Sequence, residues 1–283
     1  MIELTRIQEL KAWVRAMQAR DHRIGLVPTM GALHEGHLSL VDAARAGSDV
    51  VAMSIFVNPA QFGPDEDLAR YPRDLARDRG LASSRGVDVI FVPPVEAMYP
   101  EGAGVRVVPG KVGTRWEGEF RPGHFAGVLT IVAKLFHLCE PERAWFGQKD
   151  FQQAALIRQM VRDLDFPLQV EVVPTVREAG GLALSSRNAF LSPADREQAL
   201  GLSRALAAAA GAFASGTRDA AALERLMQGG LAVHPGVNVE YIAVADPETL
   251  EPVQQADERT VVLIAARVGA TRLIDNVILG KGL

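Results

Sequence analysis

The sequence has little cysteine, no long apolar stretch and no excess of positive charge. Cys139 is its one cysteine, which excludes an internal disulfide framework and favours a reducing compartment. No apolar run reaches the length of a membrane span. Charged side chains interrupt the apolar residues at the start of the chain, so we expect no signal peptide. These absences predict a cytoplasmic protein with no membrane partner.

The charge balance argues against nucleic acid as the main partner. The formal net charge is -4, and the isoelectric point is about 5.9, so no global positive field attracts a polyanion. A small anionic ligand is still possible, because it needs only a local group of donors. Hydrophobic residues make up 48% and charged residues 23% of the 283 residues, which is typical of a folded protein large enough for two domains.

The first part of the chain alternates between short apolar runs and helical patterns. The apolar runs predict strands at residues 24–28, 50–57, 87–92, 144–146 and 168–173. The helical patterns cover residues 7–17, 36–46, a segment opened by Pro72, 125–138 and 151–164. We expect Thr5 to cap the first helix and Pro28 to end the first of these strands. This alternation predicts an α/β fold with a parallel sheet.

After Pro174 the pattern changes to two alanine- and leucine-rich helices followed by strands. The expected helices are residues 194–213 and 220–233, and the expected strands are 237–245, 260–268 and 271–279. This order predicts a smaller α+β domain. We assign residues 1–175 to the first domain and 176–283 to the second. The glycine-rich segment 102–123 is expected to be a mobile loop over a site.

Residues 28–37, with the sequence PTMGALHEGH, give the strongest local signal. They follow the first of these strands and lead into a helix, where ligands bind in open α/β sheets. His34 and His37 are three residues apart, so both rings can point to one side of the first helical turn and hold phosphate oxygens. The HExH spacing differs from the HExxH of zinc sites. A pair of polar surface residues on a βα loop is the alternative.

The HEGH tetrad resembles the HxGH signature of the nucleotidylyltransferases, and the longer string resembles the pantothenate synthetase family. Four further segments resemble that family in the same order: 56–62 (FVNPAQF), 122–128 (PGHFAGV), 146–153 (FGQKDFQQ) and 185–188 (SSRN). The likeness extends to about Leu191. It implies a Rossmann-like domain followed by a smaller lid domain. The GxGxxG and GxxxxGK[ST] phosphate-binding motifs are both missing.

The resemblance implies an ATP-dependent ligase that condenses (R)-pantoate with β-alanine. Pantoate would attack the α-phosphate of ATP, giving a pantoyl adenylate and pyrophosphate, and β-alanine would then displace AMP. Mg²⁺ would bridge phosphate oxygens, with the nucleotide supplying most ligands and no protein metal cage. The expected partners are ATP and the two small substrates, and the family implies a homodimer.

The resemblance also implies the site residues. The catalytic residues would be His34, His37, Lys149 and Arg187. ATP would be bound by those four residues together with Met30, Gly31, Gly147, Asp150, Val176, Leu184, Ser185 and Ser186. Pantoate would be held by Met30, Asn58, Gln61 and Gln153. The family has glutamate where this chain has Gln148 and methionine where it has Leu184, and neither change removes an essential charge.

The chemistry of these residue types fits those roles. Neutral amides at Asn58 and Gln61 can hold a hydroxy acid without quenching its nucleophilic carboxylate. Lys149 can reach phosphates as a point charge, and Asp150 can accept hydrogen bonds from ribose hydroxyls. The hydroxyls and guanidinium of residues 185–187 can clamp the β- and γ-phosphates. Taken singly, these segments are also compatible with a turn, a solvated helix face and a helix-capping loop.

The loop residues Glu117 and Arg121 also match the family, and they could order over ATP or receive the amine. Two other functions remain. A nucleotidylyltransferase acting on another small carboxylate or phosphate substrate would not need the acid-binding amides, and its AMP release would not depend on β-alanine. A nucleotide-sensing protein with a disabled site would bind ATP without turnover, which the presence of the two histidines together with Lys149 and Arg187 disfavours.

Overall fold

The computed structural model describes residues 1–64 and 66–283. The chain forms two compact units. The first comprises Met1–Thr114, Gly118–Gly147 and Leu156–Pro174, and the second comprises Arg115–Glu117, Gln148–Ala155 and Thr175–Leu283. Two short segments that precede residue 174 therefore belong to the second unit. Within the described part of the chain, no helix combines the length and the apolar character needed to cross a membrane.

The first unit contains a six-stranded sheet in the order β1-β4-β3-β2-β5-β6, and every pair in it is parallel. The strands are β1 (Ile2–Leu4), β2 (Ile24–Thr29), β3 (Val50–Ile55), β4 (Val89–Phe91), β5 (Arg143–Gly147) and β6 (Gln169–Val173). β2 and β3 are mostly apolar because helices cover both faces of a parallel sheet. The expected parallel α/β domain is confirmed.

Two apolar clusters cover the two faces of this sheet. One cluster joins it to three helices, α1 (Ile7–Gln18), α6 (His124–Cys139) and α7 (Phe151–Asp163). The other joins it to α2 (Glu35–Gly47) and α3 (Leu75–Ser84). The neighbours Leu26 and Val27 of β2 belong to different clusters, as the alternation of side chains along a strand requires.

The strand order reverses between β2 and β5. From β2 the chain adds β3 and then β4 on one side, whereas β5 and β6 lie on the other side of β2. Because β2 and β5 run parallel, with Gly25 opposite Arg143, their carboxyl ends lie at the same edge. Such a switch point is where open α/β sheets bind ligands. The loop that begins at Met30 and the turn that begins at Gln148 follow these two strand ends.

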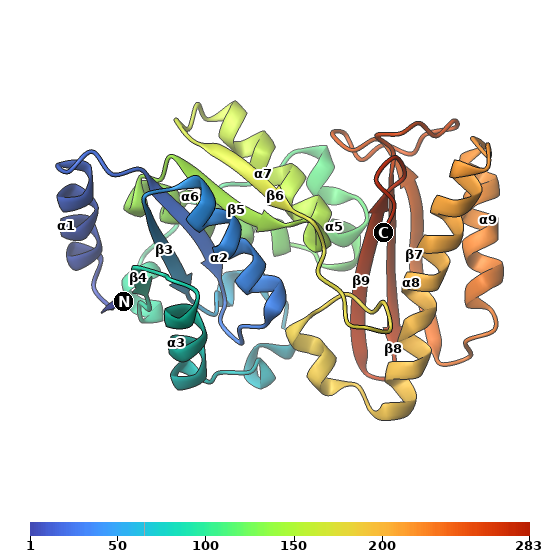
Figure 1. Ribbon diagram of the computed structural model, residues 1–283, viewed down its shortest axis with the longest axis horizontal. Helices are drawn as coiled ribbons and strands as arrows, with labels where there is room; N and C mark the ends of the chain where they lie inside the picture. Colours follow the sequence, from blue (N-terminus) through green and yellow to red (C-terminus); the bar gives the residue numbers. More distant parts are fainter. Residues whose placement is uncertain (65) are drawn as a thin grey trace. The chain divides into compact units, whose positions relative to one another are not determined.

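The second unit contains an antiparallel sheet in the order β7-β8-β9. The strands are β7 (Val237–Ala245), β8 (Val261–Val268) and β9 (Thr271–Ile278), and the helices are α8 (Pro193–Ala214) and α9 (Ala220–Leu231). Figure 1 shows the two helices beside the three strands, and a shared apolar core joins them. The expected smaller α+β fold is confirmed, whereas its role as a lid stays a prediction.

Several local expectations differ from the structure. Arg6, not Thr5, is the N-cap residue of α1, and its backbone N–H and guanidinium both donate to Glu9. Pro28 lies inside β2 and does not end it. It pairs with Ser54 of β3, and the recorded pairing with β5 involves Gly25 and Leu26. The missing N–H of Pro28 therefore falls beyond that part of the ladder.

The sequence pattern also failed to predict several short elements and one helix start. α3 begins at Leu75, after the Asp74 cap, and not at Pro72. The segment 102–123 contains the 3-10 turn η3 (Lys111–Thr114) and α5 (Glu117–Phe120). The other short elements are α4 (Val95–Met98) and the 3-10 turns η1 (Pro59–Gln61), η2 (Asp67–Arg70), η4 (Gln148–Asp150) and η5 (Ser186–Phe190). β1 has three residues, too few to give a readable period.

We expect Gly127→Ala to destabilise the first unit. An added Cβ at Gly127, in α6, would lie 2.1 Å from the Ala60 carbonyl oxygen, so backbone would have to move. Overpacking of this kind costs about 1–3 kcal/mol. The free energy of unfolding in urea measures the loss. The control is Gly211→Ala on the exposed face of α8, where nothing lies within 4 Å of the added Cβ; it should gain up to about 1 kcal/mol. Equal effects would contradict the packing argument.

Candidate active site

The loop after β2 has a backbone shape that one buried carboxylate stabilises. Gly31 and Ala32 have positive φ angles of 84° and 52°, and for Ala32 this left-handed conformation is strained. The side chain of Asp78, in α3, accepts the N–H groups of Ala32 at 2.9 Å and Leu33 at 2.8 Å. Asp78 is 2% exposed. Both donors of the strained segment are therefore satisfied away from water.

This loop places two imidazoles together at the amino end of α2. His34 is the N-cap residue of α2, and its Nδ1 accepts the Gly36 N–H at 3.1 Å. The ring centroids of His34 and His37 are 4.2 Å apart, so the expectation that both rings lie on one side of the turn is met. Since Nδ1 of His34 is an acceptor, the neutral ring carries its hydrogen on Nε2. His34 is thereby equipped to donate from Nε2 beside a helix amino end.

A second group of predicted residues lies in the turn after β3. The Nε2 group of Gln61 contacts the sulfur of Met30 at 3.2 Å, and its Oε1 accepts a hydrogen bond of 3.0 Å from Asn58 Nδ2. Two of the residues expected to hold the acid, from separate loops, therefore meet. Because Asn58 Nδ2 donates its hydrogen to the Gln61 amide, the atom that accepts must be Oε1. The Nε2 end of the amide is therefore directed toward Met30.

Asn58 is 1% exposed, and its side-chain amide bonds within the protein. Besides Gln61, Nδ2 donates to the Gly127 carbonyl at 3.1 Å. Oδ1 accepts from the Tyr99 hydroxyl at 2.7 Å and from the Ala60 N–H at 3.3 Å. These bonds use both hydrogens of the amide. Burial raises the pKa of Tyr99 to about 12, so its hydroxyl stays a donor near neutral pH.

Arg121 and His124 hold the backbone of the same turn. Arg121 forms an ion pair with Glu66 at 2.6 Å, and its Nη1 contacts Nε2 of His124 at 3.0 Å. Because a guanidinium can only donate, His124 Nε2 is the acceptor, and its Nδ1 donates to the Gln61 carbonyl at 2.8 Å. Arg121, expected as a loop residue over ATP or the amine, is 13% exposed in this pair.

In the second unit, Lys149 and Asp150 lie on the turn η4, directly before α7. The Lys149 ammonium is 3.9 Å from an oxygen of Asp150, and the two side chains are 18% and 49% exposed. Gln153 follows in the first turn of α7 and is half-buried. The neighbouring Gln152 is buried; its Oε1 accepts the Glu117 N–H at 3.1 Å and its Nε2 donates to the Arg115 carbonyl at 2.9 Å.

Glu117 takes part in a buried ion pair of the second unit. Both of its carboxylate oxygens accept from Arg272 at 2.6 Å, and Oε1 also accepts from the Tyr241 hydroxyl at 2.9 Å. Burial lowers the pKa of Arg272, but the bonds to Glu117 and Glu240 outweigh it and raise that pKa above its usual range. Burial and the Glu117 charge raise the pKa of Tyr241 well above its usual value.

The predicted phosphate clamp lies at the end of a backbone hairpin of the second unit. The Leu184 N–H donates to the Val176 carbonyl at 2.9 Å, and Arg177 pairs with Ala183. Ser185 is the N-cap of η5, its Oγ accepting the Arg187 N–H at 3.2 Å. Ser185, Ser186 and Arg187 are each partly exposed. The three side chains are therefore presented by one tight turn.

The structure thus joins Met30, Gln61 and Asn58 by direct contacts and His34 to His37 by another, all within the first unit, which also contains Gly31 and Gly147, the last residue of β5. The predicted residues of the second unit are Lys149, Asp150, Gln153, Val176, Leu184, Ser185, Ser186 and Arg187. That both groups bind one ATP stays a prediction. Sequence reasoning missed Asp78, Tyr99 and Gln152, which resemble ordinary surface or core residues when read singly.

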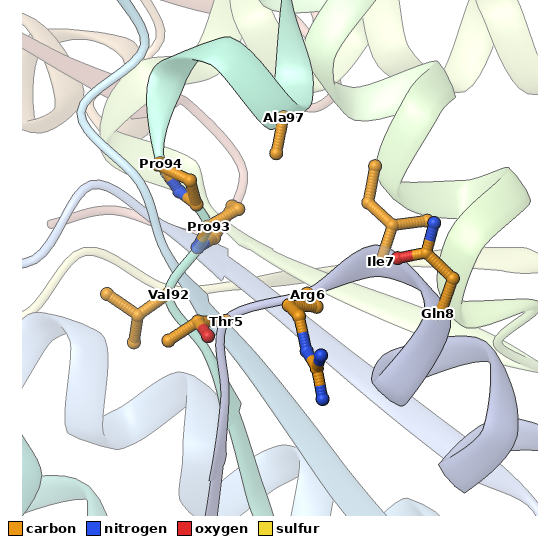
Figure 2. A pocket seen from close by; sticks show the side chains of 8 residues that line it. All are labelled: Thr5, Arg6, Ile7, Gln8, Val92, Pro93, Pro94 and Ala97. Atoms are coloured by element: carbon orange, nitrogen blue, oxygen red, sulfur yellow. The ribbon is translucent and has the colours of Figure 1, made fainter.

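One cavity elsewhere in the first unit has a different character. A surface cavity of about 670 Å³ has a mainly apolar lining, Thr5, Arg6, Ile7, Gln8, Val92, Pro93, Pro94 and Ala97 (Figure 2). Its charged residue, Arg6, pairs with Glu9 at 2.5 Å. Among the residues that the structure describes, no group of three or more His, Cys, Asp and Glu side chains could hold a metal ion.

Comparisons with known proteins agree on one family. A family model described as pantoate-beta-alanine ligase matches residues 3–278. A pantothenate synthetase of Moorella thermoacetica is 52% identical over 276 residues, which cover 98% of each chain. The crystal structure of a pantothenate synthetase from Thermus thermophilus is 48% identical, with a TM-score of 0.94 and 99% coverage of both chains.

A further solved structure carries bound molecules. The pantoate-beta-alanine ligase of Francisella tularensis is 34% identical, with a TM-score of 0.81, and the match covers 100% of this chain and 99% of that one. That protein is described as complexed with beta-gamma ATP and beta-alanine.

We expect Asp78→Asn to disturb the loop after β2. The amide keeps one acceptor but turns an NH₂ group toward a backbone N–H, so one buried donor loses its partner at a cost of about 1–3 kcal/mol. The free energy of unfolding in urea and the rate of ATP consumption should both fall. The matched control is Asp42→Asn, at an exposed pair with Arg85, which should cost less than about 1 kcal/mol. An unchanged Asp78→Asn protein would mean that the carboxylate does not hold the loop.

Proposed function

Since the chain belongs to the pantoate–β-alanine ligase family and is an ATP-dependent pantoate–β-alanine ligase, we propose that it joins (R)-pantoate to β-alanine through a pantoyl adenylate. A carboxylate does not condense with an amine in water, because oxide is a poor leaving group. A pantoate oxygen therefore attacks the α-phosphate of ATP and pyrophosphate leaves. The β-alanine nitrogen then attacks the acyl carbonyl, forms the amide and releases AMP.

His34 and His37 are proposed to stabilise the phosphate that gains charge in the first step. The observation that carries this proposal is the pair of imidazoles, 4.2 Å apart, at the amino end of α2 and beside the switch point of the sheet. A neutral His34 donor and the helix amino end both favour negative charge. Met30 and Gly31 are proposed to contribute to the same ATP site.

Lys149 and Arg187 are proposed to hold ATP from the second unit. Lys149 supplies a point charge for the phosphates, and Arg187 with Ser185 and Ser186 stabilises the departing pyrophosphate. Asp150, 49% exposed, is proposed to accept from ribose hydroxyls. The remaining proposed contacts to the nucleotide come from Gly147, Val176 and Leu184. The likeness of these segments to the family supports the assignment.

Gln61, Gln153 and Met30 are proposed to bind pantoate. The Nε2 end of Gln61, directed toward Met30, can donate to an oxygen of the acid, and a neutral donor leaves the carboxylate nucleophilic. Asn58, expected to contact the acid, is proposed to act by orienting Gln61, because its amide is buried and bonded within the protein.

Three further features are proposed on the resemblance. Mg²⁺ bound mainly by phosphate oxygens would neutralise charge during transfer. The enzyme would act in the cytoplasm, in keeping with its one buried cysteine. It would form a homodimer, which the exposed apolar side chains of Val105 and Val108 support; they are 95% and 73% exposed.

The order of the two steps gives the first test of this function. With ATP, Mg²⁺ and pantoate alone, we expect one pyrophosphate per active site in a rapid burst. Continuous release of AMP should require β-alanine, because only the amine resolves the adenylate. Quenched-flow measurement of both products, with and without β-alanine, distinguishes this course. Steady AMP release without β-alanine would instead support an adenylylating enzyme that stops at another product.

Two substitutions test the proposed residues. His37→Ala and Lys149→Ala should each lower the pyrophosphate burst rate by about 100-fold or more, because each removes a donor directed at developing charge. Circular dichroism should show unchanged folding. The matched controls are His137→Ala and Lys281→Ala, at exposed positions, which should keep the wild-type rate. Near-normal bursts in His37→Ala and Lys149→Ala would remove these residues from the mechanism.

A further inference from the structure

A buried asparagine of the second unit contacts the turn that carries Lys149. Asn276 lies on β9 and is 1% exposed. Its Nδ2 donates to the carbonyl oxygens of both Gln148 and Lys149, at 2.9 Å each. Its Oδ1 accepts from the Nε2 group of Gln148 at 3.2 Å. One side chain therefore binds two consecutive peptide groups and a neighbouring side chain.

The two peptide groups held by Asn276 are those on either side of the Lys149 Cα. The Gln148 carbonyl belongs to the peptide plane that precedes this atom, and the Lys149 carbonyl belongs to the plane that follows it. Because peptide groups are planar, fixing both planes fixes φ and ψ of Lys149 and hence the direction of its Cα–Cβ bond. The turn itself has three residues, too few for internal bonds to hold it firmly.

The residue before Asn276 anchors the other predicted ATP-binding segment of this unit. The carboxylate of Asp275, 4% exposed, accepts two bonds from Arg177, at 2.6 and 2.9 Å. Asp275 also accepts the Asn276 N–H at 2.8 Å. Arg177 begins the hairpin that leads to Ser185. Neighbouring residues of β9 thus contact both segments. A shift of β9 at this point would therefore displace the backbone of both.

We propose that Asn276 is a positioning residue for adenylate formation: it directs the Lys149 side chain toward the phosphates by holding the two flanking peptide groups. This inference rests on the proposed role of Lys149. In this role Asn276 acts through Lys149 and needs no contact of its own with ATP. Replacing a purely structural asparagine would lower the stability of the fold. Replacing a positioning residue would lower ATP affinity, but only as long as the lysine that it positions is present.

A double-mutant cycle on ATP affinity tests this dependence. The probe is α,β-methylene-ATP with Mg²⁺, which binds but does not react, and calorimetry gives its Kd. We expect Lys149→Ala to weaken binding about tenfold and Asn276→Ala about fivefold, the scale of one net hydrogen bond or charge contact. The double variant should bind no more weakly than Lys149→Ala alone. A full fivefold further loss in the double variant would overturn the proposal.

Control variants distinguish a loss of folding from a wrong assignment of Lys149 or of Asn276. Asn238→Ala, at an exposed asparagine of β7, should bind the probe as the wild type does. Thermal melting shows which variants are folded; if Asn276→Ala is not, Asn276→Ser, which keeps one donor, replaces it in the cycle. Wild-type affinity in Lys149→Ala would refute the proposed role of the lysine. Weak binding in Lys149→Ala with wild-type affinity in Asn276→Ala would refute only the role of Asn276.

Discussion

The two hydrogen bonds from Ala32 and Leu33 to the buried carboxylate of Asp78 determine how the chain leaves β2. Without them, a left-handed Ala32 would combine backbone strain with two unsatisfied donors. With them, the chain reverses in a few residues, and His34 becomes the N-cap of α2. The adjacent imidazoles, the helix amino end and the contact of Met30 with Gln61 all depend on this path. A helix that packs against the sheet thus supports the loop that is proposed to carry the chemistry.

Neutral amides hold the proposed site residues in both units. Asn58 orients Gln61, Gln152 joins the start of α7 to the backbone at Arg115 and Glu117, and Asn276 holds the turn of Lys149. A buried amide offers donors and an acceptor and does not titrate, so these supports are insensitive to pH and to the arrival of a charged nucleotide. A buried carboxylate or ammonium in the same places would add its own field to the site.

The sequence predicts the strands well because the apolar pattern that indicates a strand lies within the strand itself. Residues 50–57 form a nearly continuous apolar run, as expected for a parallel strand covered on both faces. It also predicts that residues 28–37 follow a strand and lead into a helix, whereas the role of their glycines and histidines stays a prediction. Asp78, Tyr99 and Asn276 could not be found in this way, because their partners lie 46, 41 and 128 residues away. The wrong cap at Thr5 has a different, local origin: Arg6 and Glu9, three residues apart, satisfy the helix end through side chains that N-cap preferences do not rank.

The ion pairs of the second unit determine which of its cations could bind phosphates at a low cost in free energy. Arg177 and Arg272 form bonds of 2.6 Å with Asp275 and Glu117, and moving either guanidinium would leave a buried carboxylate uncompensated, at a cost of about 3–5 kcal/mol. Lys149 is 3.9 Å from a half-exposed Asp150, where water screens the attraction. A triphosphate can therefore recruit Lys149 without breaking a buried pair. Under the proposed function, Lys149 supplies one such local charge beside Arg187, so a chain with a net charge of -4 needs no positive surface to bind a polyanion.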